Sequence, residues 1–310
     1  MIHIKNFIFN NYEIYPNKIY YIDEHDLYFF DGNEMFYICI KKSTDINENE
    51  IKVYFDLIEE VNSKNSKIKM NRIVKTKNNE FYCRKNNKII ILFKKESCDS
   101  IEEIVNFINE QDYANTLNLP IVNLKERIEK EIDKIEENVL DNYNDYPLVE
   151  KSFNYFIGMA ENSVQLLNDY DTKNEKYLGL KSSFFDFEKL SNYNIFDFFR
   201  SNKYYNEAIT IKKKIFLHEF NFNEIDHLIV EMTENDLIYL FSIFLYPIEY
   251  FDILSLMFSN EKELSREAKE KYNNVLKKII DDSNYYLKFL NYFRNKCIKF
   301  KKIELINWII

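Results

Sequence analysis

Four charged residues of this 310-residue chain could take part in phosphoryl transfer: Lys41, Glu59, Asp186 and Asp226. That chemistry needs a cation on the phosphates, carboxylates that hold Mg²⁺, and an Asp beside the attacking hydroxyl. Lys41 lies in a strand-like run and Glu59 in the helical pattern that follows, so the two could form an ion pair at a nucleotide. Asp186 could belong to a catalytic loop, and Asp226, at the end of a strand-like run, could be a magnesium ligand.

Each of the four also has a simpler structural explanation. Lys41 and Glu59 fit an exposed strand lysine and a solvated helix glutamate, Asp186 fits a loop residue, and Asp226 fits a buried or capping carboxylate. One carboxylate alone holds Mg²⁺ weakly, because the ion keeps most of its waters. We therefore treat the four as vestigial nucleotide-site candidates. We expect no catalytic residue and no metal site, with Asp226 as the metal ligand only if the chain is active.

The motifs that usually accompany such chemistry are missing. The chain has only three glycines, far apart, so it cannot contain a glycine-rich phosphate loop. It contains no His-x-Asp, and the Asp186 to Asn192 spacing is one residue longer than a catalytic loop needs. No Gly-x-Ser-x-Gly is present. His218, Asp226 and His227 could in principle meet at a metal, although isolated histidines are more often structural.

Composition places the chain among globular, intracellular proteins. The net charge of -9 argues against a nucleic-acid partner, because binding to phosphates needs concentrated Lys and Arg. Four cysteines without metal or redox spacing are typical of reduced thiols. The N-terminus lacks the pattern of a signal peptide. The longest apolar run, Leu237 to Ile248, is shorter than the ~20 residues of a membrane-spanning helix and predicts a buried core helix. We expect a cytoplasmic protein without membrane insertion.

The first third of the chain predicts an antiparallel sheet with one helix. Short runs rich in Tyr, Phe and Ile predict strands, a turn at Asp31-Gly32-Asn33 separates two of them, and an apolar stripe predicts a helix over Glu48 to Asn62. The expected strands are Lys18 to Asp23, Leu27 to Asp31, Met35 to Lys42, Met70 to Lys75, Glu80 to Arg84 and Lys88 to Phe93. This is the layout of a kinase N-terminal lobe.

The remainder predicts mainly helices, and we place the boundary so that residues 1–95 and 96–310 form two domains. Leu178 to His227 is a mixed stretch in which we expect short strands and turns. The expected helices are Ser100 to Asn118, Leu124 to Leu140, Tyr146 to Leu167, Asp236 to Phe258, Ser265 to Ile280 and Ser283 to Lys296.

Several segments of the second domain resemble the YutH branch of the CotS-type spore coat proteins. Phe153 to Ser163 is similar to the central helix of that family, and Ile225-Asp226-His227 to its Asp-His step. Leu245 to Asp252 resembles its Tyr-Pro-x-x-Tyr-Phe segment, and Trp308 fits its tryptophan near the C-terminus. In this chain Leu228 and Ile229 follow the Asp-His step, where the family usually has Pro and then Arg-Asp.

The resemblance implies an α+β, two-lobed, protein-kinase-like fold similar to aminoglycoside and choline phosphotransferases. It implies a small antiparallel-sheet N-lobe and a larger, mainly helical C-lobe. Together with the missing catalytic loop, it implies a pseudokinase-type scaffold recruited to the spore coat, with other coat or sporulation proteins as partners and no cofactor. The alternative is a divergent, active phosphotransferase that uses ATP and Mg²⁺ on a small-molecule or protein hydroxyl.

Overall fold

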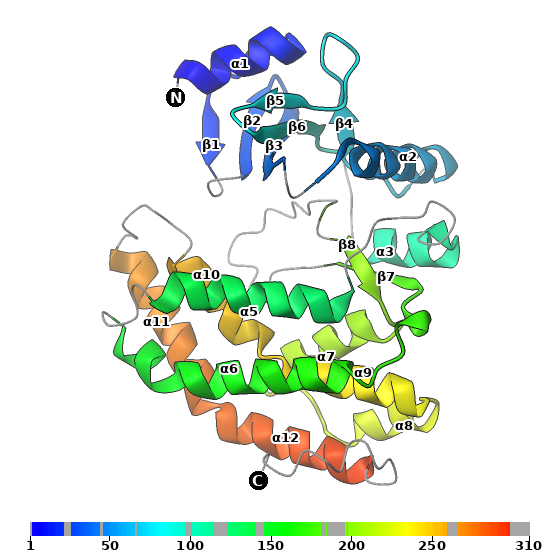
Figure 1. Ribbon diagram of the computed structural model, residues 1–310, viewed down its shortest axis with the longest axis vertical. Coiled ribbons are helices and arrows are strands. Elements are labelled where there is room, and N and C mark those ends of the chain that lie inside the picture. Colours follow the sequence, from blue (N-terminus) through cyan, green and yellow to red (C-terminus); the bar gives the residue numbers. More distant parts are fainter. Residues whose placement is uncertain are drawn as a thin grey trace. The chain divides into compact units, whose positions relative to one another are not determined.

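The chain folds into two compact units, seen in a computed structural model (Figure 1). Unit 1 comprises Met1–Ile121 with Ser191–Asp197, and unit 2 comprises Val122–Leu190 with Phe198–Ile310. Helix α3 (Ile101–Glu110) follows the boundary expected at residue 96 but groups with unit 1. The structure describes residues 2–21, 26–43, 46–65, 67–96, 101–113, 123–140, 146–180, 184, 196, 198–258 and 266–297.

Unit 1 is built on one antiparallel sheet in the order β1-β2-β3-β6-β4, with β5 also paired to β6. All six predicted strand runs are confirmed, as is the helix between the third and fourth strands. The elements are α1 (Ile2–Tyr12), β1 (Ile19–Tyr21), β2 (Asp26–Asp31), β3 (Glu34–Lys42), α2 (Glu48–Lys64), β4 (Arg72–Val74), β5 (Cys83–Lys85), β6 (Lys88–Lys94) and α3.

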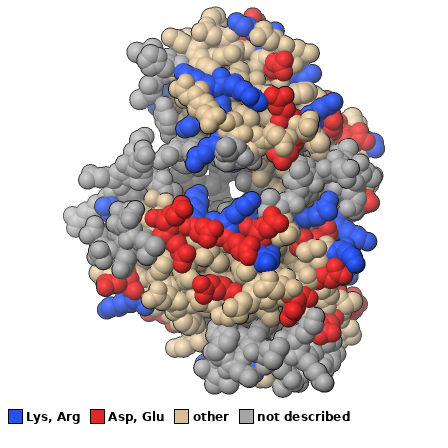
Figure 2. All heavy atoms as spheres, viewed as in Figure 1, with Lys and Arg blue, Asp and Glu red and all other residues tan. Residues whose placement is uncertain are grey.

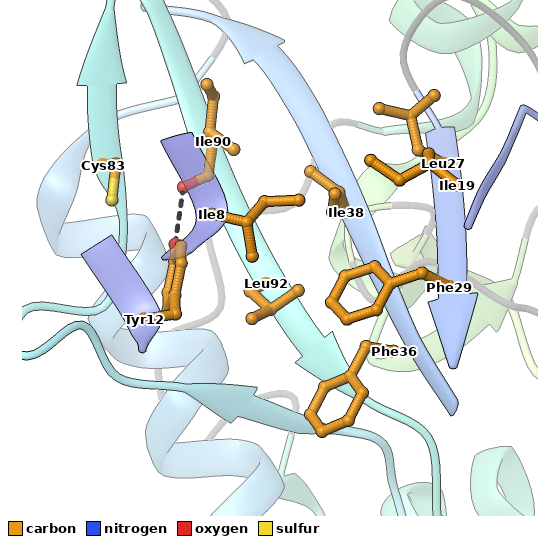
Figure 3. Packing of buried hydrophobic residues seen from close by; sticks show 10 residues of the cluster. All are labelled: Ile8, Tyr12, Ile19, Leu27, Phe29, Phe36, Ile38, Cys83, Ile90 and Leu92. Carbon is orange, nitrogen blue, oxygen red and sulfur yellow. Dashed lines mark hydrogen bonds between the residues drawn. The ribbon is translucent and has the colours of Figure 1, made fainter. Parts of the chain in front are cut away.

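Helix α1 covers one face of the sheet and was not among the expected elements. Ile8 and Tyr12 lie one turn apart on it and pack among strand residues such as Leu92 (Figure 3). The Tyr12 hydroxyl donates a hydrogen bond of 3.2 Å to the carbonyl oxygen of Ile90. The apolar spacing Ile4, Ile8, Tyr12 is a helical signal, because residues four apart share one face of a helix.

Helix α2 begins where local chemistry requires it to. Asn47 and Glu50 form a capping box: each side chain accepts a 3.0 Å hydrogen bond from the backbone N–H of the other residue. This satisfies two backbone donors that the first turn would otherwise leave unpaired. The residues buried on α2 are Ile51, Tyr54, Leu57, Ile58, Val61 and Asn62.

Unit 2 is mainly helical, with one two-stranded antiparallel hairpin, β7–β8. The predicted helices at α5, α6, α11 and α12 are confirmed to within about two residues. The elements are α5 (Leu124–Leu140), α6 (Pro147–Leu167), β7 (Tyr177–Leu180), β8 (Phe198–Ser201), α7 (Tyr205–Phe216), α8 (Glu224–Val230), α9 (Glu234–Leu245), α10 (Ile248–Phe258), α11 (Arg266–Asp281) and α12 (Ser283–Lys296).

Two predictions for this unit were wrong in part. The mixed stretch Leu178 to His227 contains the helices α7 and α8 as well as the strands. The pattern of α7 was hidden because Lys212, a charged residue, occupies one of its buried positions. The single helix predicted over Asp236 to Phe258 is two helices, α9 and α10, separated at Pro247, whose ring and missing N–H do not fit a helix interior.

The stretch Glu234–Phe258 is long and apolar enough to cross a membrane, with a mean hydropathy of 1.6, but 94% of it is buried inside the structure. Helix α9 packs against α6, and the Ser163 hydroxyl donates a 2.8 Å hydrogen bond to the carbonyl oxygen of Ser242. The predicted buried core helix is therefore confirmed for α9 and extends into α10.

Candidate functional site

Lys41 lies near the end of β3, directly opposite Ile89 of β6, and its side chain is half-buried. Residues two apart on a strand point to the same face, so Lys41 shares its face with Tyr37 and Cys39. This is the face opposite α1, because Phe36 and Ile38, which pack in the cluster with α1, point the other way.

Glu59, the expected partner of Lys41, lies on the exposed side of α2. The ion pairs that the described residues form do not include one between these two side chains. The helix turns apolar residues such as Ile58 toward the sheet instead. The structure therefore does not bring Lys41 and Glu59 together.

Asp226 lies in the first turn of α8, so its expected position after a strand was wrong. Its carboxylate accepts hydrogen bonds from two residues of α12: from the Lys296 ammonium at 2.6 Å and from the Tyr292 hydroxyl at 3.1 Å. The hydrogen bond from Lys296 lowers the pKa of Asp226. In this arrangement Asp226 joins α8 to α12. Asp186 and Trp308 lie outside the described residues.

The connections of the sheet in unit 1 contain a single glycine. Gly32 stands in the two-residue turn between β2 and β3, with a φ of +58°, a backbone angle that such hairpin turns require. Asn86 and Asn87 make the corresponding turn between β5 and β6. Residues 22–25, between β1 and β2, read Ile-Asp-Glu-His and thus carry two carboxylates.

Sequence reasoning missed a buried polar network in unit 2. Asn202, directly after β8, donates a 2.7 Å hydrogen bond to Asp236 and a longer one of 3.4 Å to the hydroxyl of Tyr170. Asp236 in turn accepts from Thr233 at the start of α9. The network ties the hairpin to α9. Asn-Lys after a strand is an ordinary turn signal, so the sequence offered no means of finding it.

Two further charged clusters lie inside this unit. Arg127 is 3.4 Å from the Glu131 carboxylate, and its guanidinium lies 4.4 Å from the centroid of the Phe199 ring. Lys212 is 1% exposed and lies 3.3 Å from the Glu249 carboxylate. Burial lowers the pKa of Lys212, and the Glu249 carboxylate opposes that shift. Buried ion pairs of this kind are strongly constrained, because removing one partner leaves an isolated charge.

The described residues contain no group of three or more His, Cys, Asp or Glu side chains that could hold a metal ion. This applies to His218, Asp226 and His227, the set considered from the sequence. Figure 2 shows acidic side chains gathered in a band over α5 on the face in view. Helix α5 contributes six Asp and Glu residues against four Lys and Arg.

Comparison with known proteins shows the fold. No protein-family model matches the sequence, and no curated protein matches it either. Amicoumacin kinase hAmiN, solved with AMP-PNP, Ca²⁺ and Ami, is similar in structure with a TM-score of 0.51, 12% identity, and 91% of this chain and 93% of that chain covered. An aminoglycoside phosphotransferase from Alicyclobacillus acidocaldarius has a TM-score of 0.47 at 10% identity, covering 94% of this chain and 93% of that chain. Spectinomycin phosphotransferase, in complex with ADP and spectinomycin, has a TM-score of 0.44 at 12% identity, covering 90% and 97%.

The chain therefore has a kinase-like fold of the aminoglycoside phosphotransferase type, with an N-terminal antiparallel sheet and a mainly helical C-terminal part. This confirms the expected fold class. Identity this low establishes the fold alone and carries no activity with it.

Proposed function

We propose that this protein is a kinase-fold scaffold that does not transfer phosphoryl groups. The observation that carries the proposal is the make-up of the sheet connections in unit 1. Phosphates bind where successive backbone N–H groups can approach them closely, which requires glycines. Gly32 is taken up by a two-residue turn, and the connection at residues 22–25 adds negative charge and no glycine.

The state of the other candidates supports the same proposal. An active site of this type needs a lysine oriented on the phosphates and a carboxylate available to Mg²⁺. Glu59 does not pair with Lys41, and Asp226 is engaged by Lys296 and Tyr292. A carboxylate that already neutralises an ammonium gains less from binding a metal.

We further propose that the scaffold acts at the spore coat, where it binds other coat or sporulation proteins. The motive is the resemblance of Phe153 to Ser163 and Leu245 to Asp252 to YutH-type proteins. Unit 1 offers a contact surface: Tyr20 and Tyr28 stack at 4.8 Å, and Phe30, 44% exposed, lies edge-on to both. Aromatic side chains at a surface are the usual anchors of protein interfaces.

Thermal unfolding with and without millimolar ATP and Mg²⁺ tests the first proposal. A ligand at 100 times its Kd stabilises the folded state by about 2.7 kcal/mol, which a melting curve resolves easily. We expect no Mg²⁺-dependent rise in Tm for the wild type or for Lys41→Ala. A rise that is lost in both Lys41→Ala and Asp226→Ala would overturn the scaffold proposal.

That second result would establish the alternative, a divergent phosphotransferase acting on a small-molecule or protein hydroxyl. One observation favours this alternative: the similar amicoumacin kinase was solved with AMP-PNP. The spore coat role is tested separately, by expressing a fluorescent fusion in sporulating cells of the source organism. Fluorescence that stays diffuse throughout sporulation would exclude coat recruitment, whatever the nucleotide result.

A further inference from the structure

A small pocket in unit 2 lies where four helices meet. It is lined by Lys212 and Phe216 of α7, Glu249 of α10, Ile279 of α11, and a group at the start of α12. The α12 group consists of Asp282, Tyr285 and Tyr286. All these residues belong to unit 2, so the pocket does not depend on how the two units are placed. Its empty volume is about 320 Å³, part of which is open solvent.

Two carboxylate oxygens at this pocket accept no hydrogen bond. They are Oε2 of Glu249 and Oδ2 of Asp282, and both atoms are shielded from solvent. Glu249 as a whole is only 8% exposed. A buried carboxylate oxygen without a donor is costly, because water solvates the same atom well. The two atoms therefore call for a donor that the chain itself does not supply.

The nearest protein cations do not meet this need. Lys212 directs its ammonium at the end of α9, donating to the carbonyl oxygen of Tyr246 at 2.6 Å. It lies within 3.4 Å of the carbonyl oxygens of Ile243 and Phe244 as well. Its 3.3 Å approach to Oε2 of Glu249 is an ion pair without hydrogen-bond geometry.

His218 is the second nearby base. Its Nε2 lies 3.2 Å from Oδ2 of Asp282, again without a hydrogen bond. Its ring packs on Tyr285, with the centroids 4.5 Å apart. At pH 8 an ordinary imidazole is neutral, so the two carboxylates then exceed the one ammonium by a full negative charge.

The pocket walls fit a positively charged group that carries N–H donors. Tyr286 uses its hydroxyl on the carbonyl oxygen of Phe244 and presents its ring, 4.9 Å from the Lys212 ammonium. Aromatic faces attract ammonium groups. The small volume limits the ligand to a short alkyl chain. A metal ion does not fit, since the described residues offer no set of three metal-ligating side chains.

We propose that this pocket binds a small primary alkylammonium ion, whose N–H groups donate to Glu249 and Asp282. The shared chemistry is one ammonium head with a short apolar stem lying against the tyrosine rings. This site is separate from the scaffold proposal: it lies wholly within unit 2 and involves none of the vestigial nucleotide-site candidates.

The test measures Tm and ligand-observed NMR with the full-length chain at pH 8 and low salt, using ethylammonium chloride as the probe. The limit on binding energy per atom restricts so small a ligand to an affinity of about 1 mM. We expect Tm to rise with ethylammonium concentration beyond the rise produced by equal NaCl. Tetramethylammonium, which has the charge but no N–H donor, should behave like NaCl. An equal response to all three salts would overturn the proposal without any variant.

Asp282→Asn, with Asp281→Asn as the matched control, then assigns the site. Asp281 is the exposed neighbour and does not line the pocket. Losing a charged acceptor should shift the ethylammonium response to about tenfold higher concentration in Asp282→Asn and leave Asp281→Asn unchanged. Equal responses in the two variants would place the bound ammonium elsewhere and refute the assignment.

Discussion

Replacing Lys212 with Met should lower the free energy of unfolding of unit 2 by about 4 kcal/mol. The substitution leaves Glu249 as a buried carboxylate without its counter-charge, which typically costs about 3–5 kcal/mol. It also removes the donor from the carbonyl oxygen of Tyr246, at about 1 kcal/mol. The methionine recovers part of this loss through its apolar contacts.

Scanning calorimetry measures this effect, and Lys214→Met is the matched control. Lys214 lies on the exposed side of the same helix, two residues away, so its replacement should stay within about 0.5 kcal/mol. For a unit of this size, about 4 kcal/mol corresponds to a fall in Tm of roughly 8–16 °C. If Lys212→Met cost no more than Lys214→Met, Lys212 would not be a buried ion-pair partner, and the packing of α7 against α9 and α10 would be wrong.

Three more expectations follow from local contacts. Glu175 is buried, and burial raises its pKa to about 7; the folded state therefore binds more protons than the unfolded state between about pH 4.5 and 7, and stability falls as pH rises through that window. Glu175→Gln should remove this loss, about 2 kcal/mol between pH 5 and 8 in urea titrations, and an unchanged pH profile would refute the assignment. Asn202→Ala should cost about 2 kcal/mol by leaving Asp236 short of a buried donor, whereas Asn202→Asp should not restore it, because both side chains are then acceptors. Asn47→Ala should cost about 1 kcal/mol through the lost capping box, and hydrogen exchange should show faster opening of the first turn of α2 only; protection equal to the wild type would contradict the cap.

Local signals predicted most of the elements. The strands of unit 1 were found because β-rich runs are separated by Gly or Asn turn residues, and α2 because its apolar stripe follows one helical face. Helices α5 and α12 were predicted with the bounds they have, since each carries a regular pattern over its whole length. The order of these elements was sufficient to predict the kinase-like fold class.

The predictions failed where a residue's environment overrides its type. Lys212 and Glu249 are charged, and a charged residue in a sequence indicates a surface. Their burial depends on α7, α10 and α12 meeting around one ammonium, which no stretch of the sequence expresses. The break at Pro247 was available locally, because proline disfavours a helix interior, and the apolar run around it masked the signal.

Candidate site residues divide in the same way. The sequence determined that no glycine-rich phosphate loop can form, since three glycines cannot supply one. It also determined which lysine and carboxylates were worth considering. Only the tertiary structure decided that Glu59 faces away from Lys41, that Asp226 pairs with Lys296, and that Glu249 and Asp282 share a pocket. Composition and spacing act along the chain, whereas a site depends on which side chains distant segments bring within hydrogen-bonding reach.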